Sequence, residues 1–308
     1  MAGGARIRPV PAVDPRVLAL LGRVWPKIPP AVTLADSLGF SWAEVSTPFV
    51  HYAGDRAVAH VGVIELPLVI GGRQRMVGSI HGVCTDPDHR GRGHARVLMQ
   101  TALAHCRVRY GSVVLTTLIP EFYARPHGFR VVPEHAFTRP VAGIRPSAGG
   151  RRLSATVEDG RLLTRLLARR TPVSERLGSL DAVTVFVFAL LLGWGDLSRA
   201  YHHAALDVVT VHEVVERTLV LYDVVGATIP RLDDLLEAIG ADVERVVTLF
   251  LPDRLGPGFR AEAWDAPRAG ARRGRLHPPH GARRAEHRRR GVHAAGDRQD
   301  VIRRTAGR

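Results

Sequence analysis

The chain has 308 residues, enough for two modest domains with cores of their own, and carries a formal net charge of +14. With only two cysteines and no zinc-ligand spacing, the sequence excludes a disulfide scaffold and predicts no metal site. We expect Cys84 and Cys106 to be small buried residues. The start lacks the pattern of a signal peptide, and the longest mostly apolar run, Val183–Leu192, is too short to span a bilayer. We therefore expect a cytoplasmic protein without membrane contact.

The first third of the chain predicts a helix followed by three antiparallel strands. Apolar residues at helical spacing predict a helix over residues 17–25. Three runs with strand patterns follow, and short turn sequences that contain glycine separate them; the runs are residues 43–51, 57–70 and 76–85. A helix that begins near Gly93 and a buried parallel strand over Ser112–Leu118 complete the pattern. We expect an α/β sandwich with a mixed central sheet and flanking helices.

The segment between the third strand and the long helix has the composition of a phosphate-binding loop. It reads Asp-Pro-Asp-His-Arg-Gly-Arg-Gly-His-Ala-Arg over residues 86–96. Glycines let the backbone approach phosphate oxygens, and the N-terminus of a helix favours negative charge. Arg90, Arg92 and Arg96 add positive charges. Neither the dinucleotide-binding G-x-G-x-x-G nor the P-loop motif occurs here.

The loop fits R-x-x-G-x-A, with Arg90, Gly93 and Ala95 as its fixed points. In this the chain resembles the GNAT superfamily of acyl-CoA-dependent N-acetyltransferases, whose loop reads Q/R-x-x-G-x-G/A between a strand and a helix. Residues 121–129 (EFYARPHGF) are similar to the superfamily's F-Y-x-x-x-G-F signature, with one extra residue before the glycine. The resemblance covers roughly residues 15–140.

The resemblance implies acetyl-CoA as co-substrate, with no metal. The pantetheine arm would pair with the end of the third strand, and the pyrophosphate would lie on the loop. The implied cofactor-binding residues are Val83, Cys84, Thr85, Arg90, Gly91, Arg92, Gly93, His94 and Ala95.

Acyl transfer to an amine needs a base for the amine, a polarised thioester carbonyl and a proton for the departing thiolate. Tyr123 matches the superfamily's tyrosine, whose hydroxyl acts as general acid beside the CoA sulfur; the alternative is a core tyrosine packed between Phe122 and Phe129. A backbone N–H near His81 would polarise the carbonyl. His81 is the predicted base, on the same strand face as Ser79 and Val83, with Glu65 or a water chain as alternatives. In a regular strand Cys84 would point away from His81, so we expect no covalent intermediate.

The sequence therefore predicts an N-acyltransferase that moves an acetyl group from acetyl-CoA to a primary amine by direct attack in a ternary complex. The alternative function is a non-catalytic acyl-CoA-binding regulatory module. The acceptor, a small molecule or a peptide amine, would meet residues 26–38 or the Gly71-Gly72 hairpin, which carry no distinctive charge. The sequence is also compatible with a homo-oligomer.

We expect a GNAT domain over residues 1–140, a linker over 141–157 and a second, smaller α/β unit over 158–265. The second unit shows leucines on one helix face (residues 158–170), an ambiguous apolar run (184–192), and then strand, strand, helix and strand patterns (207–212, 218–225, 232–239 and 245–251). Without a glycine-rich loop, this order resembles the degenerate second half of tandem-GNAT proteins. We expect His202 and His203 to be packing or surface residues.

Residues 266–308 form an arginine-rich segment that we expect to be a disordered basic tail. It holds thirteen arginines and three acidic residues, and so accounts for +10 of the net charge of +14. It has no aromatic residues and little apolar periodicity. An out-of-frame translation of a GC-rich gene would produce the same composition, so this hypothesis stands beside that of a plain disordered tail. Nucleic acid is not an expected partner, although clustered arginine can bind phosphate.

Overall fold

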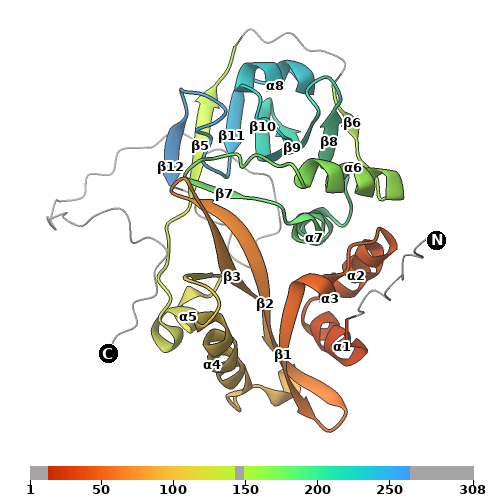
Figure 1. The fold of residues 1–308 in the computed structure, drawn as a ribbon, viewed down its shortest axis with the longest axis vertical. Coiled ribbons are helices and arrows are strands. Elements are labelled where there is room, and N and C mark those ends of the chain that lie inside the picture. The colour runs from red at the N-terminus through yellow and green to blue at the C-terminus, as the bar shows by residue number, and fades with distance from the viewer. Residues whose placement is uncertain (1–12, 143–148, 264–308) are drawn as a thin grey trace, which may run out of the picture.

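A computed structural model describes residues 13–142 and 149–263, and these residues form two β-sheets with flanking helices (Figure 1). The first sheet has the order β1-β2-β3-β4, and β7 also pairs with β2. Its strands are β1 (Ser46–Ala53), β2 (Arg56–Ile70), β3 (Arg73–Thr85), β4 (Val113–Val114) and β7 (Leu177–Ser179). The α/β fold class with a mixed central sheet is confirmed.

The second sheet has the order β12-β5-β11-β10-β9-β8-β6. Its strands are β5 (His135–Pro140), β6 (Arg151–Arg152), β8 (Ala200–His203), β9 (Val208–Val215), β10 (Thr218–Val225), β11 (Arg245–Thr248) and β12 (Arg260–Ala263). The helices are α1 (Pro15–Val24), α2 (Ile28–Ser37), α3 (Trp42–Val45), α4 (His94–Arg107), α5 (Pro120–His127), α6 (Val157–Leu167), α7 (Val183–Trp194) and α8 (Leu232–Ile239), and a 3₁₀ turn covers Pro87–His89. The predicted basic tail lies outside the described residues.

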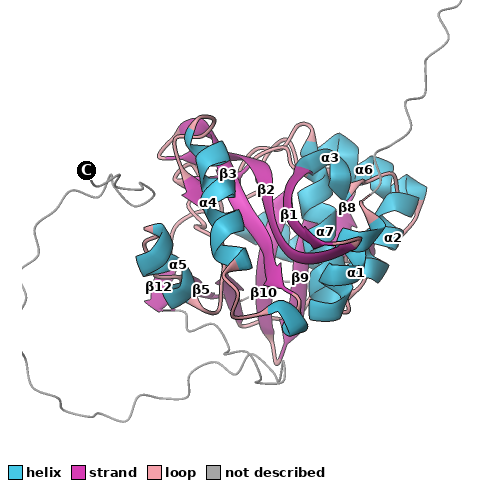
Figure 2. Cartoon of the chain, turned by 90° about the horizontal axis from the view of Figure 1, so that it is seen from below, coloured by secondary structure: helices cyan, strands magenta, loops and turns pink. Residues whose placement is uncertain are grey.

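Helices cover both faces of the first sheet (Figures 1 and 2). On one face α1 packs Val17, Leu20 and Leu21 against the sheet, and Asp14 caps this helix by accepting a hydrogen bond from the Arg16 N–H. On the other face α4 packs an apolar stripe that includes Met99 against β2 and β3. The sheet is therefore buried on both sides, as the apolar run of β2 requires.

Strand β3 contains a β-bulge that changes which residues share a face. Cys84 lies opposite His60, and His81 lies opposite Gly62, so three steps along β3 match two along β2. Gly82 supplies the positive φ of 56° that the bulge needs. His81 and Cys84 therefore lie on the same face, because directly paired residues of an antiparallel ladder point to the same side. The prediction that they point apart is wrong.

The bulge also corrects the predicted neighbours of His81. Val83 packs in the cluster on the α4 face, whereas His60, the partner of Cys84 across the ladder, contacts Gly82 and adjoins Leu21 of α1. His81 thus shares a face with Ser79 but not with Val83. Glycine inside a strand often marks a bulge, but β3 contains both Gly78 and Gly82, so the sequence does not tell which of them carries it.

Strand β4 is shorter and less buried than the predicted strand over Ser112–Leu118. Only Val113 and Val114 pair with β3, in parallel register, and both are half-buried. Strand β5 does not pair with β4, because it belongs to the second sheet, where it pairs with β11 and β12. Among the described residues β4 is therefore an edge strand. Its side chains are only half-buried, whereas the sequence predicted a buried strand.

The second sheet repeats the strand order of the first. Strands β8, β9 and β10 are antiparallel neighbours, and α8 connects β10 to the parallel strand β11. In the first sheet β1, β2 and β3 are likewise antiparallel, and α4 connects β3 to the parallel β4. The expected strand, strand, helix and strand pattern is confirmed. The ambiguous apolar run proves to be a helix, α7, with apolar residues all round.

The two halves share one core. A cluster of buried residues joins α2 to α6, α7 and the second sheet; it includes Ala35, Phe40, Leu163, Phe188 and Val209. Strand β7 extends the first sheet, and β5 lies in the second, so strands cross between the halves in both directions. Residues 26–38 were expected to form an acceptor loop, but α2 occupies most of them and buries one side against α7. No helix in the described part of the chain is long and apolar enough to cross a membrane.

Candidate active site

The predicted phosphate loop lies at the N-terminus of α4. Gly93 is the N-cap residue, with φ at 80° and no side-chain cap, and Gly91 has φ at 76°. No atom lies within 4 Å of a Cβ placed on either glycine, and residues 90–93 are exposed. The first N–H groups of α4 therefore face open space without a capping side chain. Because α4 has no acidic residue in its first turn, an anion would meet only positive charge there.

Asp86 anchors the start of this loop. Its carboxylate is 1% exposed, and it accepts hydrogen bonds from the Arg56 guanidinium at 2.7 Å and from the Asp88 N–H at 3.0 Å. Arg23 of α1 lies 3.4 Å away. These contacts connect the loop to α1 and to β2. No role was predicted for Asp86, although an Asp-Pro pair that follows a strand is a turn signal.

Replacing Asp86 by alanine should lower the free energy of unfolding by about 1–3 kcal/mol, because the Asp88 N–H loses its acceptor inside the protein. The two arginines are nearly half exposed and can return to water, which limits the loss. Chemical denaturation measures the change, and Asp55→Ala in the exposed β1–β2 turn is the control. An unchanged denaturation midpoint for Asp86→Ala would show that the loop does not depend on this carboxylate.

Beyond Ser79, strand β3 has a partner on one side only. The ladder between β3 and β4 pairs Gly78 with Val113 and Ser79 with Val114, and the described residues extend it no further. Strand β3 nevertheless continues to Thr85, paired with β2. The backbone of residues 80–85 therefore presents an open strand edge that leads toward the loop. The predicted residues Val83, Cys84 and Thr85 lie on this edge.

His81 lies on the α1–α3 face of the sheet in a tight environment. Its Nε2 is 2.8 Å from the Ser46 hydroxyl, and its ring meets the Trp42 ring edge-on at 5.1 Å. Gly62 lies opposite, where a Cβ would come within 2.1 Å of the imidazole, so only glycine leaves room for this ring. Burial, with the nearby His60, lowers the pKa of His81 to about 3. The ring is therefore neutral at physiological pH.

Glu65, the alternative base, belongs to a different part of the molecule. Glu65 shares a face of β2 with Val63, two residues before it, and Ile64 points the other way. Val63 packs in the cluster on the α4 face, so Glu65 lies on that face too. Its carboxylate accepts a hydrogen bond of 2.8 Å from the Tyr110 hydroxyl. His81 and Glu65 thus lie on opposite faces of the sheet, and the structure does not bring them together.

Tyr123 projects from α5 into the cluster on the α4 face. The centroid of its ring lies 4.9 Å from that of Phe122 and 6.2 Å from that of Phe129, and the residue is 8% exposed. Burial raises the pKa of the phenol, which keeps its proton in place at neutral pH. The N–H of Gly128, a C-cap residue with φ at 72°, binds the Ala124 carbonyl at 2.9 Å. The extra residue before Gly128 therefore lies within the last turn of α5, which also contains Pro126.

His94 begins α4, and its ring lies 4.4 Å from that of His51 on β1. Partial desolvation, His51, Arg92 and His89 all lower the pKa of His94. This contact was not expected, because no sequence pattern links β1 to the loop. Among the described residues no group of three or more histidine, cysteine or acidic side chains could hold a metal ion.

The first sheet is thus a mixed sheet with an open strand edge beside a glycine-rich helix start. Residues 15–132 match the family model of the acetyltransferase (GNAT) domain, so this part of the chain is similar to GNAT acetyltransferases. No curated protein sequence matches the chain.

Two solved structures extend the similarity beyond this domain. A probable N-acyltransferase from Enterococcus faecalis V583, described as a conserved protein of unknown function, matches with a TM-score of 0.53 and 14% identity, over 80% of this chain and 67% of that one. Eis1 from Mycobacterium abscessus matches with a TM-score of 0.50 and 16% identity, over 77% and 63%. At these identities the matches show the fold alone. The chain spans about two thirds of the length of these solved chains.

Proposed function

We propose that the protein is an N-acetyltransferase that moves an acetyl group from acetyl-CoA to a primary amine by direct attack in a ternary complex. The observation that carries the proposal is the open edge of β3 next to the uncapped start of α4. An extended chain ending in a pyrophosphate, as in acyl-CoA, matches both features: amide groups pair with the edge, and phosphate meets the helix N-terminus. The match of residues 15–132 to the GNAT domain model supports the same function.

In the proposed reaction the amine nitrogen attacks the thioester carbon, and the C–S bond then breaks. A backbone N–H of β3 near His81 would stabilise the developing oxyanion. The phenol of Tyr123, which its raised pKa keeps protonated, would donate to the departing thiolate. His81, held neutral beside Ser46 on the opposite face of the sheet from Tyr123, would accept the proton that the amine loses, so the two groups would act on the thioester from opposite sides of β3. We keep a water chain as the alternative base.

A thiol-release assay tests this function. The full chain is incubated with acetyl-CoA and a panel of aminoglycosides, polyamines, small primary amines and peptides with free N-termini. We expect amine-dependent release of CoA, with the acetylated amine as the second product by mass spectrometry. Hydrolysis alone, or no release with any amine, would contradict the proposal.

The cytoplasmic location and a homo-oligomeric state remain predictions from the sequence.

One observation favours the alternative function, a non-catalytic acyl-CoA-binding module. Tyr123 is nearly buried among aromatic side chains, which is the environment of a packing residue. Binding of acetyl-CoA without turnover of any amine would support this alternative.

His81→Ala should lower kcat/KM by roughly 10²-fold, the low end of a general acid–base contribution, because a group with so low a pKa is a weak base. The neutral imidazole is the form present above its pKa, so its own titration affects the rate only near pH 3. An acidic limb between pH 5 and 8 should therefore persist in the variant. Rate profiles over pH measure both effects, with His202→Ala as the control. A rate within a few-fold of wild type would assign the role to water or Glu65.

A further inference from the structure

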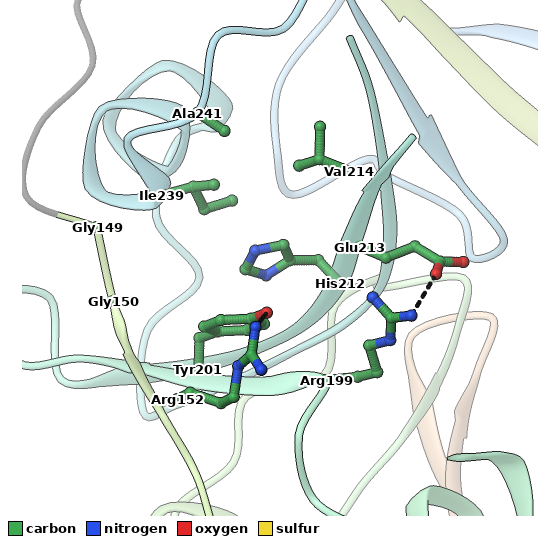
Figure 3. A pocket seen from close by; sticks show the side chains of 10 residues that line it. All are labelled: Gly149, Gly150, Arg152, Arg199, Tyr201, His212, Glu213, Val214, Ile239 and Ala241. Atoms are coloured by element: carbon green, nitrogen blue, oxygen red, sulfur yellow. Dashed lines mark hydrogen bonds and ion pairs between the residues drawn. The ribbon is translucent and has the colours of Figure 1, made fainter. Parts of the chain in front are cut away.

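A hollow of about 320 Å³ lies on the second sheet, and the described residues that line it run from Gly149 to Ala241 (Figure 3). Its walls come from the β6 and β8 strands, the end of β9 and the residues around the end of α8. None of the residues assigned to acyl transfer takes part. The hollow combines charged, aromatic and apolar side chains, which is the composition of a small-molecule site.

A chain of hydrogen bonds fixes the chemical form of His212, which lies in this pocket. His203 Nδ1 is 3.1 Å from the Ala238 carbonyl oxygen, which can only accept, so Nδ1 of His203 carries the proton. His203 Nε2 then accepts from the Thr210 hydroxyl at 2.9 Å. The Thr210 oxygen in turn accepts from His212 Nδ1 at 2.8 Å. His212 is therefore protonated on Nδ1, and its Nε2 is an acceptor.

Burial and the neighbouring groups keep His212 in this neutral form. The residue is 6% exposed, and burial, His203 and Arg199 lower its pKa to about 3. Its ring stacks on Tyr201 at 4.3 Å, and the two rings form one wall of the pocket (Figure 3). The pocket thus offers a fixed acceptor nitrogen that a ligand donor can use, because Nε2 of His212 has no hydrogen-bond partner among the described residues and is not shut off from solvent.

The charge at the rim is positive. Arg199 pairs with Glu213 at 3.2 Å, and Glu213 also accepts from the Tyr222 hydroxyl at 2.6 Å, so this carboxylate is engaged. Arg152 instead donates to the Tyr201 hydroxyl at 3.2 Å and forms no ion pair with a described residue, while its charge, together with that of Arg199, helps to lower the pKa of Asp196. Its planar fork of donors matches a carboxylate.

The opposite wall is apolar and closely fitted. Ile239 and Ala241 line it, and Figure 3 shows Ile239 across the pocket from Tyr201. A Cβ on Gly150 would come within 2.6 Å of the His203 ring, so only glycine lets the chain pass here without displacing the hydrogen-bonded histidine. The wall suits an apolar ligand body rather than a bare inorganic anion.

We propose that this pocket binds a small organic carboxylate that also carries a hydroxyl or amino group and an apolar body. The carboxylate pairs with Arg152, the hydroxyl or amino group donates to His212 Nε2, and the apolar body lies against Ile239 and Ala241. The site is independent of acyl transfer, since it uses other residues of the chain.

The test uses the ¹⁵N-labelled full chain and the imidazole resonances of His212, assigned with His212→Gln. The free protein should show the Nδ1-protonated tautomer. Mandelate should shift these resonances saturably, with a dissociation constant on the order of 1 mM. Phenylacetate, which lacks the hydroxyl, and 1-phenyl-1,2-ethanediol, which lacks the charge, should each bind roughly tenfold more weakly or worse.

Arg152→Gln should weaken mandelate binding by roughly tenfold or more, because a charge-assisted hydrogen bond is lost. Arg161→Gln, an exposed arginine of α6 outside the pocket, should leave binding unchanged. Circular dichroism confirms that each variant is folded. The proposal is overturned if mandelate gives no saturable shift of His212 up to 20-fold above the expected constant, roughly 20 mM. It is equally overturned if phenylacetate and the diol bind as tightly as mandelate, or if Arg152→Gln binds like wild type.

Discussion

Gly93→Asp should abolish acetyl-CoA binding, with a loss of affinity of at least roughly 100-fold. An aspartate at this position would place a carboxylate where the pyrophosphate meets the N–H groups of α4, and the two negative charges would repel. No atom lies within 4 Å of the added Cβ, so the substitution fills the space of the ligand rather than that of the protein. Isothermal titration calorimetry with acetyl-CoA measures the effect.

The φ of 80° at Gly93 strains any other residue, and this cost needs its own control. Gly39→Asp supplies it, because Gly39 has φ at 84°, is equally open, and lies between α2 and α3 away from the loop. We expect the two variants to lose similar stability, whereas only Gly93→Asp loses binding. A folded Gly93→Asp protein with wild-type affinity would show that the loop is not the cofactor site.

Tyr123→Phe should lower kcat by roughly 10²–10⁴-fold while acetyl-CoA binding is retained, since only the proton donor to the thiolate is removed. The aromatic ring stays, so the packing against Phe122 and Phe129 is kept. Single-turnover kinetics with the best acceptor amine, together with calorimetry, separates chemistry from binding.

The matched control is Tyr110→Phe, which removes a hydroxyl from the same face of the sheet, where it donates to Glu65. We expect its turnover to stay within a few-fold of wild type. If Tyr123→Phe behaves in the same way, Tyr123 is a packing residue. The proton must then come from another donor, or the module binds acyl-CoA without turning it over.

The architecture of the first sheet could be predicted from the sequence because its signals are local. Glycine turns near residues 54 and 71 separate strands of alternating or apolar pattern, and a short turn permits only an antiparallel hairpin. The loop could be predicted equally well, because its glycines determine its backbone conformation and its arginines determine its charge. The same holds for the strand–helix–strand order of the second half, where each element has a clear period.

Other predictions failed because long-range contacts decide them. The face of His81 depends on a bulge in the register between β2 and β3. Residues 26–38 form a helix because α7 offers an apolar partner, and the run at 184–192 is helical because it fills the core that both halves share. The period of an apolar stretch is ambiguous when every side is buried.

The sequence by itself determined the class of fold, the loop and the candidate tyrosine, because motif, turn and periodicity lie within short stretches of chain. Only the tertiary structure decided the setting of the chemistry. It buries His81 beside Ser46 and Trp42, separates it from Glu65, and ties Asp86 to α1 and β2. It also joins His203, Thr210 and His212 into one hydrogen-bonded chain. Burial and partner identity set the charge state of a side chain, and both depend on residues that are distant in sequence.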